Sequence, residues 1–233
     1  MLKNVVFFDF YNTLAKFWPP LPYIQMQAGL KFGFELQESK VKKGYQVADI
    51  FFNKQNETNP ISTMSSGMRS SFFAEYEKII LNAAGLDVSL DLAKKIWEQA
   101  IKIPKEFILF DDTIDALKQI QNNGISIGII TNLRADMPTL LHKLKLEQYI
   151  DGVINSRDAG YEKPDPRIFH DAFKLFNVSP GNSLHVGDQY RSDVQGAIAV
   201  GMSAVLLDRE NFHPEYGDCK TIKTLLDLNL IFN

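Results

Sequence analysis

Apolar runs of strand length alternate with helix-like segments at short spacing after residue 108. The pattern predicts strands at 125–130, 152–155, 184–186 and 204–207, and helices at 112–123, 137–145, from Pro166 onward and at 193–200. Asp112 is the expected N-cap of the first helix, and Gly124 follows its end. Such alternation is typical of a parallel sheet with helices on both faces, so the sequence predicts an α/β core.

Residues 16–106 interrupt this alternation. They contain helix-like stretches at about 23–32, 40–54, 66–84 and 90–101, with no clear strand. Gly33, Asn59-Pro60 and Gly85 separate these stretches, as residues that end helices commonly do. We therefore expect a core formed by residues 1–15 and 107–233, with an all-helical domain inserted at 16–106.

A carboxylate, Asp9, follows the apolar run Val5–Phe8. A buried carboxylate costs free energy unless it has a partner or a chemical task. Later polar groups follow other expected strands or lie in the loops after them: Thr131-Asn132, Lys163-Pro164-Asp165 and Gly187-Asp188-Gln189-Tyr190-Arg191-Ser192-Asp193. Ligands bind at the carboxyl ends of strands in open α/β sheets, so we expect Asp9, Thr131, Lys163 and Asp188 to converge.

This ordered set of motifs resembles the haloacid dehalogenase-like (HAD) hydrolase superfamily over nearly the whole chain. The family pattern is an N-terminal Asp-x-Asp-x-Thr, then Ser or Thr, then Lys, then Gly-Asp and a second Asp. The resemblance implies a Rossmann-like core and a helical cap that closes over the site. One position departs from the pattern, because Tyr11 stands where the second Asp is usual.

Asp9 is the expected nucleophile. A carboxylate can attack phosphorus and form an aspartyl-phosphate, which divides one hard displacement into two. Asp9, Asp188 and Asp193 offer the oxygen ligands that Mg²⁺ prefers, and the resemblance adds the backbone carbonyl of Tyr11. We therefore expect a Mg²⁺-dependent phosphohydrolase that acts on a small phosphorylated metabolite.

The remaining motif residues have groups suited to binding a phosphate. Thr131 and Asn132 can donate hydroxyl, amide and backbone N–H groups to phosphoryl oxygens. Lys163 would neutralise the nucleophile and the phosphate as a point charge. We accordingly assign Thr131, Asn132 and Lys163 to substrate binding and catalysis.

Tyr11 should lie on the same side of an extended segment as Asp9, where it replaces the usual general acid/base. A phenol of pKa near 10 protonates a leaving group poorly, and lost acid–base assistance costs roughly 10²–10⁴-fold in rate. We therefore expect slow turnover of phosphate esters with poor leaving groups.

Two alternatives remain open. An Asp-x-Tyr-x-Thr opening resembles the L-2-haloacid dehalogenases, in which the Asp attacks carbon and no leaving-group acid is needed. Against that alternative, this sequence keeps both Asp188 and Asp193, and it has no Arg before Arg69 to match the cap arginine of those enzymes. The other alternative is a catalytically weak HAD-like binding protein.

Composition excludes several other classes. A net charge of −3 and a pI near 5.8 give no basic field for nucleic acid. Cys219 is the only cysteine, so an intramolecular disulfide is impossible. No apolar run approaches the ~18 residues of a membrane-spanning helix, and the first apolar run, Val5–Phe8, is too short for the core of a signal peptide. We therefore expect a cytoplasmic protein without a membrane partner. The sequence defines neither the oligomeric state nor the cap residues that set specificity.

Overall fold

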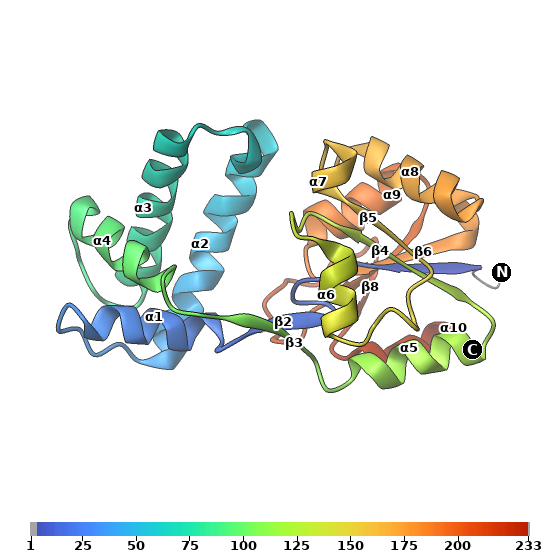
Figure 1. The fold of residues 1–233 in the computed structure, drawn as a ribbon, viewed down its shortest axis with the longest axis horizontal. Coiled ribbons are helices and arrows are strands. Elements are labelled where there is room, and N and C mark those ends of the chain that lie inside the picture. The colour runs from blue at the N-terminus through green and yellow to red at the C-terminus, as the bar shows by residue number, and fades with distance from the viewer. Residues whose placement is uncertain (1–3, 233) are drawn as a thin grey trace. The chain divides into compact units, whose positions relative to one another are not determined.

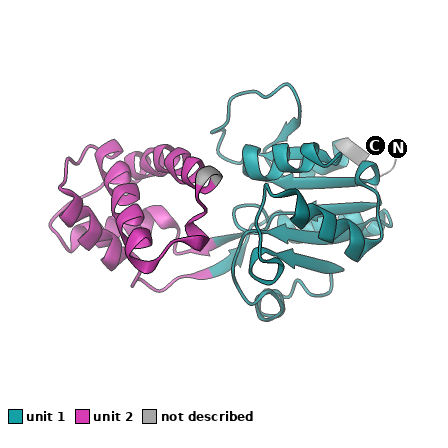
Figure 2. Ribbon diagram, turned by 90° about the horizontal axis from the view of Figure 1, so that it is seen from above, with its two compact units in different colours: residues 1–16, 107–233 teal, residues 17–106 magenta. Residues whose placement is uncertain are grey.

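The computed structural model describes residues 4–232, and the chain divides into two compact units (Figure 2). We call residues 1–16 and 107–233 the core unit, and residues 17–106 the helical unit. Buried apolar clusters fill both units. Each unit therefore has a hydrophobic core of its own.

A six-stranded parallel sheet forms the centre of the core unit, in the order β5-β4-β1-β6-β7-β8 (Figure 1). Its strands are β1 (Val5–Phe8), β4 (Ser126–Thr131), β5 (Gly152–Asn155), β6 (Ser183–Gly187), β7 (Ser203–Leu207) and β8 (Lys220–Ile222). In β1, Val5 pairs with Ser126 on one side and with Ser183 on the other. The first strand in the chain is therefore an interior strand of the sheet.

Helices cover both faces of this sheet, as Figure 1 shows for α5 and α8. The helices of the unit are α5 (Thr113–Asn122), α6 (Met137–Lys143), α7 (Ser156–Ala159), α8 (Pro166–Phe176), α9 (Gly196–Ala199) and α10 (Asn229–Phe232). Val6 and Phe8 pack with residues of α5 and α6, whereas Val5 and Phe7 pack with residues of α8 and α9. Successive strand side chains face opposite ways, so all of β1 is buried. The predicted α/β fold class is confirmed.

Gly128 of β4 makes room for two aromatic rings beside β1. It is the register partner of Phe7, whose ring meets Phe176 of α8 edge to face with 4.9 Å between centroids. A methyl group at position 128 would lie 2.6 Å from Phe7 Cδ1 and 2.8 Å from Phe176 Cζ. The absence of a side chain at Gly128 therefore allows α8 to pack closely on the sheet.

The helical unit contains four long helices, as the sequence predicts. They are α1 (Leu21–Leu30), α2 (Glu38–Thr58), α3 (Ser66–Ala83) and α4 (Leu90–Ala100). The hydroxyls of Ser65 and Ser89 cap α3 and α4 by accepting from backbone N–H groups in the first turn. Gly44 lets α2 approach α3 closely, since a methyl group there would lie 2.5 Å from the Ile80 carbonyl oxygen.

Two local features differ from the sequence prediction. Short strands, β2 (Ala15–Trp18) and β3 (Glu106–Leu109), form a two-stranded sheet at the ends of the segment predicted to lack strands. Four residues are too few to show a clear period of two. The helix predicted at 193–200 is instead a π-helical turn at Tyr190–Gln195, followed by the short α9.

Asp112 stands at the N-cap of α5 as predicted, but its side chain does not cap the helix. Its carboxylate accepts from both terminal nitrogens of Arg209, at 2.8 and 2.9 Å, and from the Thr224 hydroxyl at 2.7 Å. Arg209 lies 97 residues away in sequence, so the helix signal at Asp112 could not reveal this partner.

Candidate active site

The predicted site residues lie at the carboxyl ends of three neighbouring strands. Asp9 directly follows β1, Thr131 ends β4, and Asp188 directly follows β6. The order of the sheet changes direction at β1, because the chain continues through β4 and β5 on one side and through β6 to β8 on the other. Ligand-binding crevices in open α/β sheets form at such a switch point.

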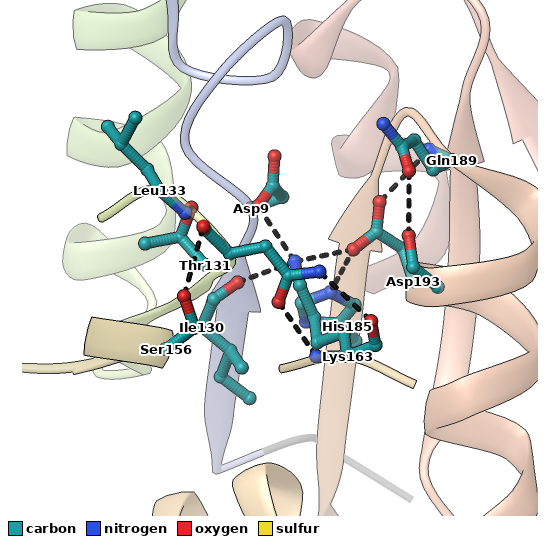
Figure 3. Close-up of polar contacts among 11 residues, drawn as sticks. Asp9, Ile130, Thr131, Leu133, Ser156, Lys163, His185, Gln189 and Asp193 are labelled. Carbon is teal, nitrogen blue, oxygen red and sulfur yellow. Dashed lines mark hydrogen bonds and ion pairs between the residues drawn. The ribbon is translucent and has the colours of Figure 1, made fainter. Parts of the chain in front are cut away.

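Lys163 is the centre of the polar network (Figure 3). Its Nζ lies 2.7 Å from Asp9 Oδ1, 2.6 Å from Asp193 Oδ1 and 2.7 Å from the Ile130 carbonyl oxygen. The residue is only 4% exposed, and each N–H of its ammonium group has an acceptor. The structure thus brings Asp9, Lys163 and Asp193 into direct contact.

Charge stabilises the pair of Lys163 and Asp193. Burial works to lower the pKa of Lys163, but Asp193 and Asp9 outweigh it and raise that pKa above its ordinary value. Burial likewise works against ionised Asp193, but Lys163 and His185 hold the pKa of Asp193 below its usual range. Both groups are therefore charged at neutral pH.

The site has more acidic than basic groups. Oxygen atoms of Asp9, Asp188 and Asp193 all lie within 4.8 Å of one another. Burial, followed by Asp9 and Asp193, raises the pKa of Asp188 well above its ordinary value, and burial and Asp193 raise the pKa of Asp9 against the effect of Lys163. One ammonium group does not balance three carboxylates, so this donor set fits a hard divalent cation with oxygen ligands.

His185 also belongs to the network, although no sequence motif marks it. Its Nε2 lies 3.1 Å from Asp193 Oδ1, and the side chain is completely buried in β6 (Figure 3). Burial lowers the pKa of His185, so the ring is neutral and its Nε2–H donates to Asp193. The backbone N–H of Gln189 donates to the other Asp193 oxygen at 2.9 Å. The only sequence signal for His185 is its polar side chain within the otherwise apolar strand predicted at 184–186.

Asn132 holds the loop that carries Lys163. Its amide oxygen accepts from the Lys163 backbone N–H at 2.7 Å, and its amide nitrogen donates to the Lys163 carbonyl at 2.9 Å. The Ser156 hydroxyl donates to the Asn132 carbonyl at 3.0 Å. The side chain of Asn132 is therefore already engaged with the protein, a contact that the sequence did not reveal.

Thr131 and Tyr11 flank the acidic residues. Thr131 ends β4, the neighbour of β1, and Tyr11 lies two residues beyond Asp9. Thr131 is 1% exposed, and its hydroxyl oxygen accepts from the Leu133 N–H at 3.2 Å, so the hydroxyl can still donate a hydrogen bond. Tyr11 is half-buried, and its ring meets Phe107 edge-on with 6.1 Å between centroids. Phe10, between Asp9 and Tyr11, is fully buried in the core.

Comparison with known proteins identifies the family. A family model described as haloacid dehalogenase-like hydrolase matches residues 3–201. The haloacid dehalogenase-like hydrolase domain-containing protein 3 of Homo sapiens is 30% identical over 203 residues, an alignment that covers 85% of this chain and 79% of that protein. The chain therefore belongs to the haloacid dehalogenase-like hydrolase family, as its motifs predicted.

Two further comparisons extend this finding. The ribulose-1,5-bisphosphate 5-phosphatase of Halopiger xanaduensis is 26% identical over 212 residues, covering 89% of this chain and 85% of that protein. YfnB of Bacillus subtilis, a HAD-hydrolase solved with bound magnesium, shares the fold with a TM-score of 0.70 and 17% identity over the full length of both chains. Among residues 4–232, no helix is long and apolar enough to cross a membrane.

Proposed function

We propose that the protein is a Mg²⁺-dependent phosphohydrolase acting on a small phosphorylated metabolite. The observation that carries the proposal is the group of three carboxylates, with oxygen atoms within 4.8 Å of one another, around the buried ammonium of Lys163. Phosphoryl transfer needs compensating positive charge, because an anionic nucleophile must approach an anionic substrate. Three carboxylates can hold the divalent cation that would supply this charge. The similarity to a sugar bisphosphate phosphatase supports the same reaction class.

Asp9 acts as the nucleophile in this proposal. A carboxylate oxygen attacks phosphorus, the bond to the leaving oxygen breaks, and the phosphoryl group is transferred to Asp9 as an acyl phosphate. Water then attacks the acyl phosphate and releases inorganic phosphate with regeneration of Asp9. Lys163, 2.7 Å from Asp9 Oδ1, holds the nucleophile in place and offsets negative charge.

Asp9 and Asp188 would hold the metal, and Asp193 is the third carboxylate of the site. The backbone carbonyl of Tyr11 would be a further ligand. Bound Mg²⁺ supplies positive charge for the phosphoryl oxygens. The raised pKa values of Asp9 and Asp188 fit this assignment, because burial and the neighbouring carboxylates disfavour their charged forms and a divalent cation would offset both effects.

Thr131 and Asn132 would bind the oxygens of the phosphoryl group by hydrogen bonds. Thr131 is the last residue of β4, which pairs with the strand that Asp9 follows. Its hydroxyl and the backbone N–H groups of the following loop can donate hydrogen bonds to phosphoryl oxygens. Because the Asn132 side chain is bound to the Lys163 backbone, we assign it to positioning Lys163, in addition to the substrate contact predicted for it. We also propose that the helical unit serves as the cap that selects the substrate.

A dehalogenase reaction is the second candidate, and Tyr11 is the residue that favours it. In that reaction Asp9 would attack carbon and displace halide without a leaving-group acid. Arg69, the first arginine of the chain, donates to the Ser62 and Met64 carbonyls within its own unit, at 3.5 and 3.3 Å. Its guanidinium group is therefore already engaged by backbone carbonyls of its own unit.

Assays with two substrate classes test the proposal. We expect wild-type protein to hydrolyse p-nitrophenyl phosphate with Mg²⁺, because the activated leaving group needs no acid. A chelator should abolish this activity. Asp9→Asn should be inactive, and Asp188→Asn should lose Mg²⁺ dependence together with most of its activity. Metal-independent halide release from 2-chloropropionate, without phosphatase activity, would support the dehalogenase instead.

A further inference from the structure

The segment that follows β7 folds back onto the residue that follows β6. Asp208, 5% exposed, anchors this segment by accepting from the Phe212 N–H at 2.8 Å and from the His213 N–H at 2.9 Å. The Asp208 N–H itself donates to the Ile222 carbonyl of β8 at 2.8 Å. The backbone of His213 is therefore held in place by a buried carboxylate that is tied to the sheet.

The ring of His213 reaches the peptide group of Asp188. Its Nε2 lies 3.0 Å from the Asp188 carbonyl oxygen. A carbonyl oxygen only accepts, so Nε2 carries the hydrogen and donates it. Asp188 lies just beyond the last ladder pair of β6 and β7, Gly187 with Leu206, so the sheet no longer fixes this peptide.

A second contact joins the same two segments. Tyr216 stacks on Tyr190 with 3.4 Å between ring centroids and 4° between planes, and the Tyr190 hydroxyl donates to Asp218 at 2.7 Å. Tyr190 is two residues beyond Asp188. The segment 208–218 thus supports the Asp188 loop both at its first peptide and at its next turn.

We propose that His213 is a positioning residue for metal binding, which orients the carboxylate of Asp188 by holding its peptide carbonyl. The inference rests on the proposed function, in which Asp188 is a ligand of Mg²⁺. Groups that orient a metal ligand contribute to metal affinity, and their loss typically weakens binding about 10–100-fold. The side chain of His213 would act through the Asp188 peptide and touch neither metal nor substrate.

The experiment measures Mg²⁺ binding directly, by isothermal titration of the full chain with Mg²⁺ alone. His213→Gln keeps an N–H donor on a side chain of similar length, whereas His213→Met removes the donor at similar size. His142→Ala is the matched control, because His142 is an exposed histidine paired with Glu147. Melting in chelator checks that each variant is folded.

We expect His213→Met to raise the Kd for Mg²⁺ at least about tenfold, with His213→Gln and His142→Ala near wild type. Wild-type affinity in folded His213→Met, or equal weakening in the Gln and Met variants, would overturn the inference about the donor. If wild type shows no saturable Mg²⁺ binding, or Asp188→Asn binds as wild type does, the proposed metal site fails and this inference fails with it.

Discussion

Lys163 Nζ lies 2.6 Å from Asp193 Oδ1, and both side chains are only 2% exposed. Breaking a buried pair by removing one partner leaves an uncompensated charge and costs roughly 3–5 kcal/mol. We therefore expect Lys163→Met to lower the free energy of unfolding by about that amount, as measured by urea denaturation followed by circular dichroism. Lys42→Met breaks the exposed pair with Glu38 and should cost less than about 1 kcal/mol. Equal costs would show that Lys163 has no special structural role.

Mg²⁺ should stabilise the protein through Asp188. A ligand that prefers the native state raises the free energy of unfolding by about 2.7 kcal/mol at 100 times its Kd. We expect the melting temperature of the wild type to rise in Mg²⁺ relative to chelator, and that of Asp188→Asn to stay unchanged. Equal shifts in both proteins would remove Asp188 from the set of metal ligands.

Tyr11 is expected to limit turnover of alkyl phosphates. Tyr11→Asp restores a carboxyl group at the position of the general acid, so hydrolysis of alkyl phosphates should rise by roughly 10²-fold or more. Hydrolysis of p-nitrophenyl phosphate should change far less, because its leaving group needs little protonation. An unchanged alkyl-to-aryl ratio of kcat/KM would show that the missing carboxylate does not limit catalysis.

Glu77 should make the helical unit less stable as pH rises. It is 2% exposed, accepts from the Gln25 amide, and burial raises its pKa from 4.5 to about 7. Between these pH values the unfolded chain loses this proton and the folded unit keeps it, so stability falls as pH rises, by up to about 3 kcal/mol, and stays low above pH 7.

Glu77→Gln tests this expectation, because it keeps an oxygen acceptor for Gln25 and removes the titration. Both tryptophans, Trp18 and Trp97, lie in the helical unit, so their fluorescence during denaturation reports on that unit. The variant should match the wild type near pH 4.5 and exceed its stability near pH 8. A wild type that is at least as stable as the variant near pH 8 would contradict the expectation.

A side chain at position 128 should destabilise the protein. Gly128→Ala forces a methyl group to within 2.6 Å of Phe7 and 2.8 Å of Phe176, and overpacking of this kind typically costs about 1–3 kcal/mol. Gly181→Ala is the control, since nothing lies within 4 Å of a methyl group there. Equal unfolding midpoints in urea for the two variants would mean that α8 shifts without cost.

Much of the fold follows from local sequence patterns. The apolar runs and helical periods predict β1, β4 to β7, α1 to α6 and α8, because those patterns reflect burial on one face or on both. Parallel strands then bring their carboxyl ends together, so motifs spaced along the chain meet near β1. For this reason Asp9, Thr131, Lys163 and Asp188 could be named from the sequence as candidates for one site.

Contacts between distant residues were not predictable. His185 has no partner at a spacing that signals chemistry, and Asp193, which it contacts, lies in a π-helical turn where an α-helix was expected. The engagement of Asp112 with Arg209 and of Asn132 with the Lys163 backbone spans 97 and 31 residues. Such pairings depend on tertiary geometry, about which one sequence carries little local signal.

The interior place of β1 has a consequence for synthesis of the chain. Val5 pairs with Ser126 and Ser183, so β1 must wait for two strands that are translated much later. At about 5–20 residues per second, the nascent chain carries the apolar segment Val5–Phe8 unpaired for several seconds or longer. During that interval the segment exposes apolar side chains and unpaired backbone groups, which favour aggregation, whereas both edges of β1 are paired once the sheet is complete.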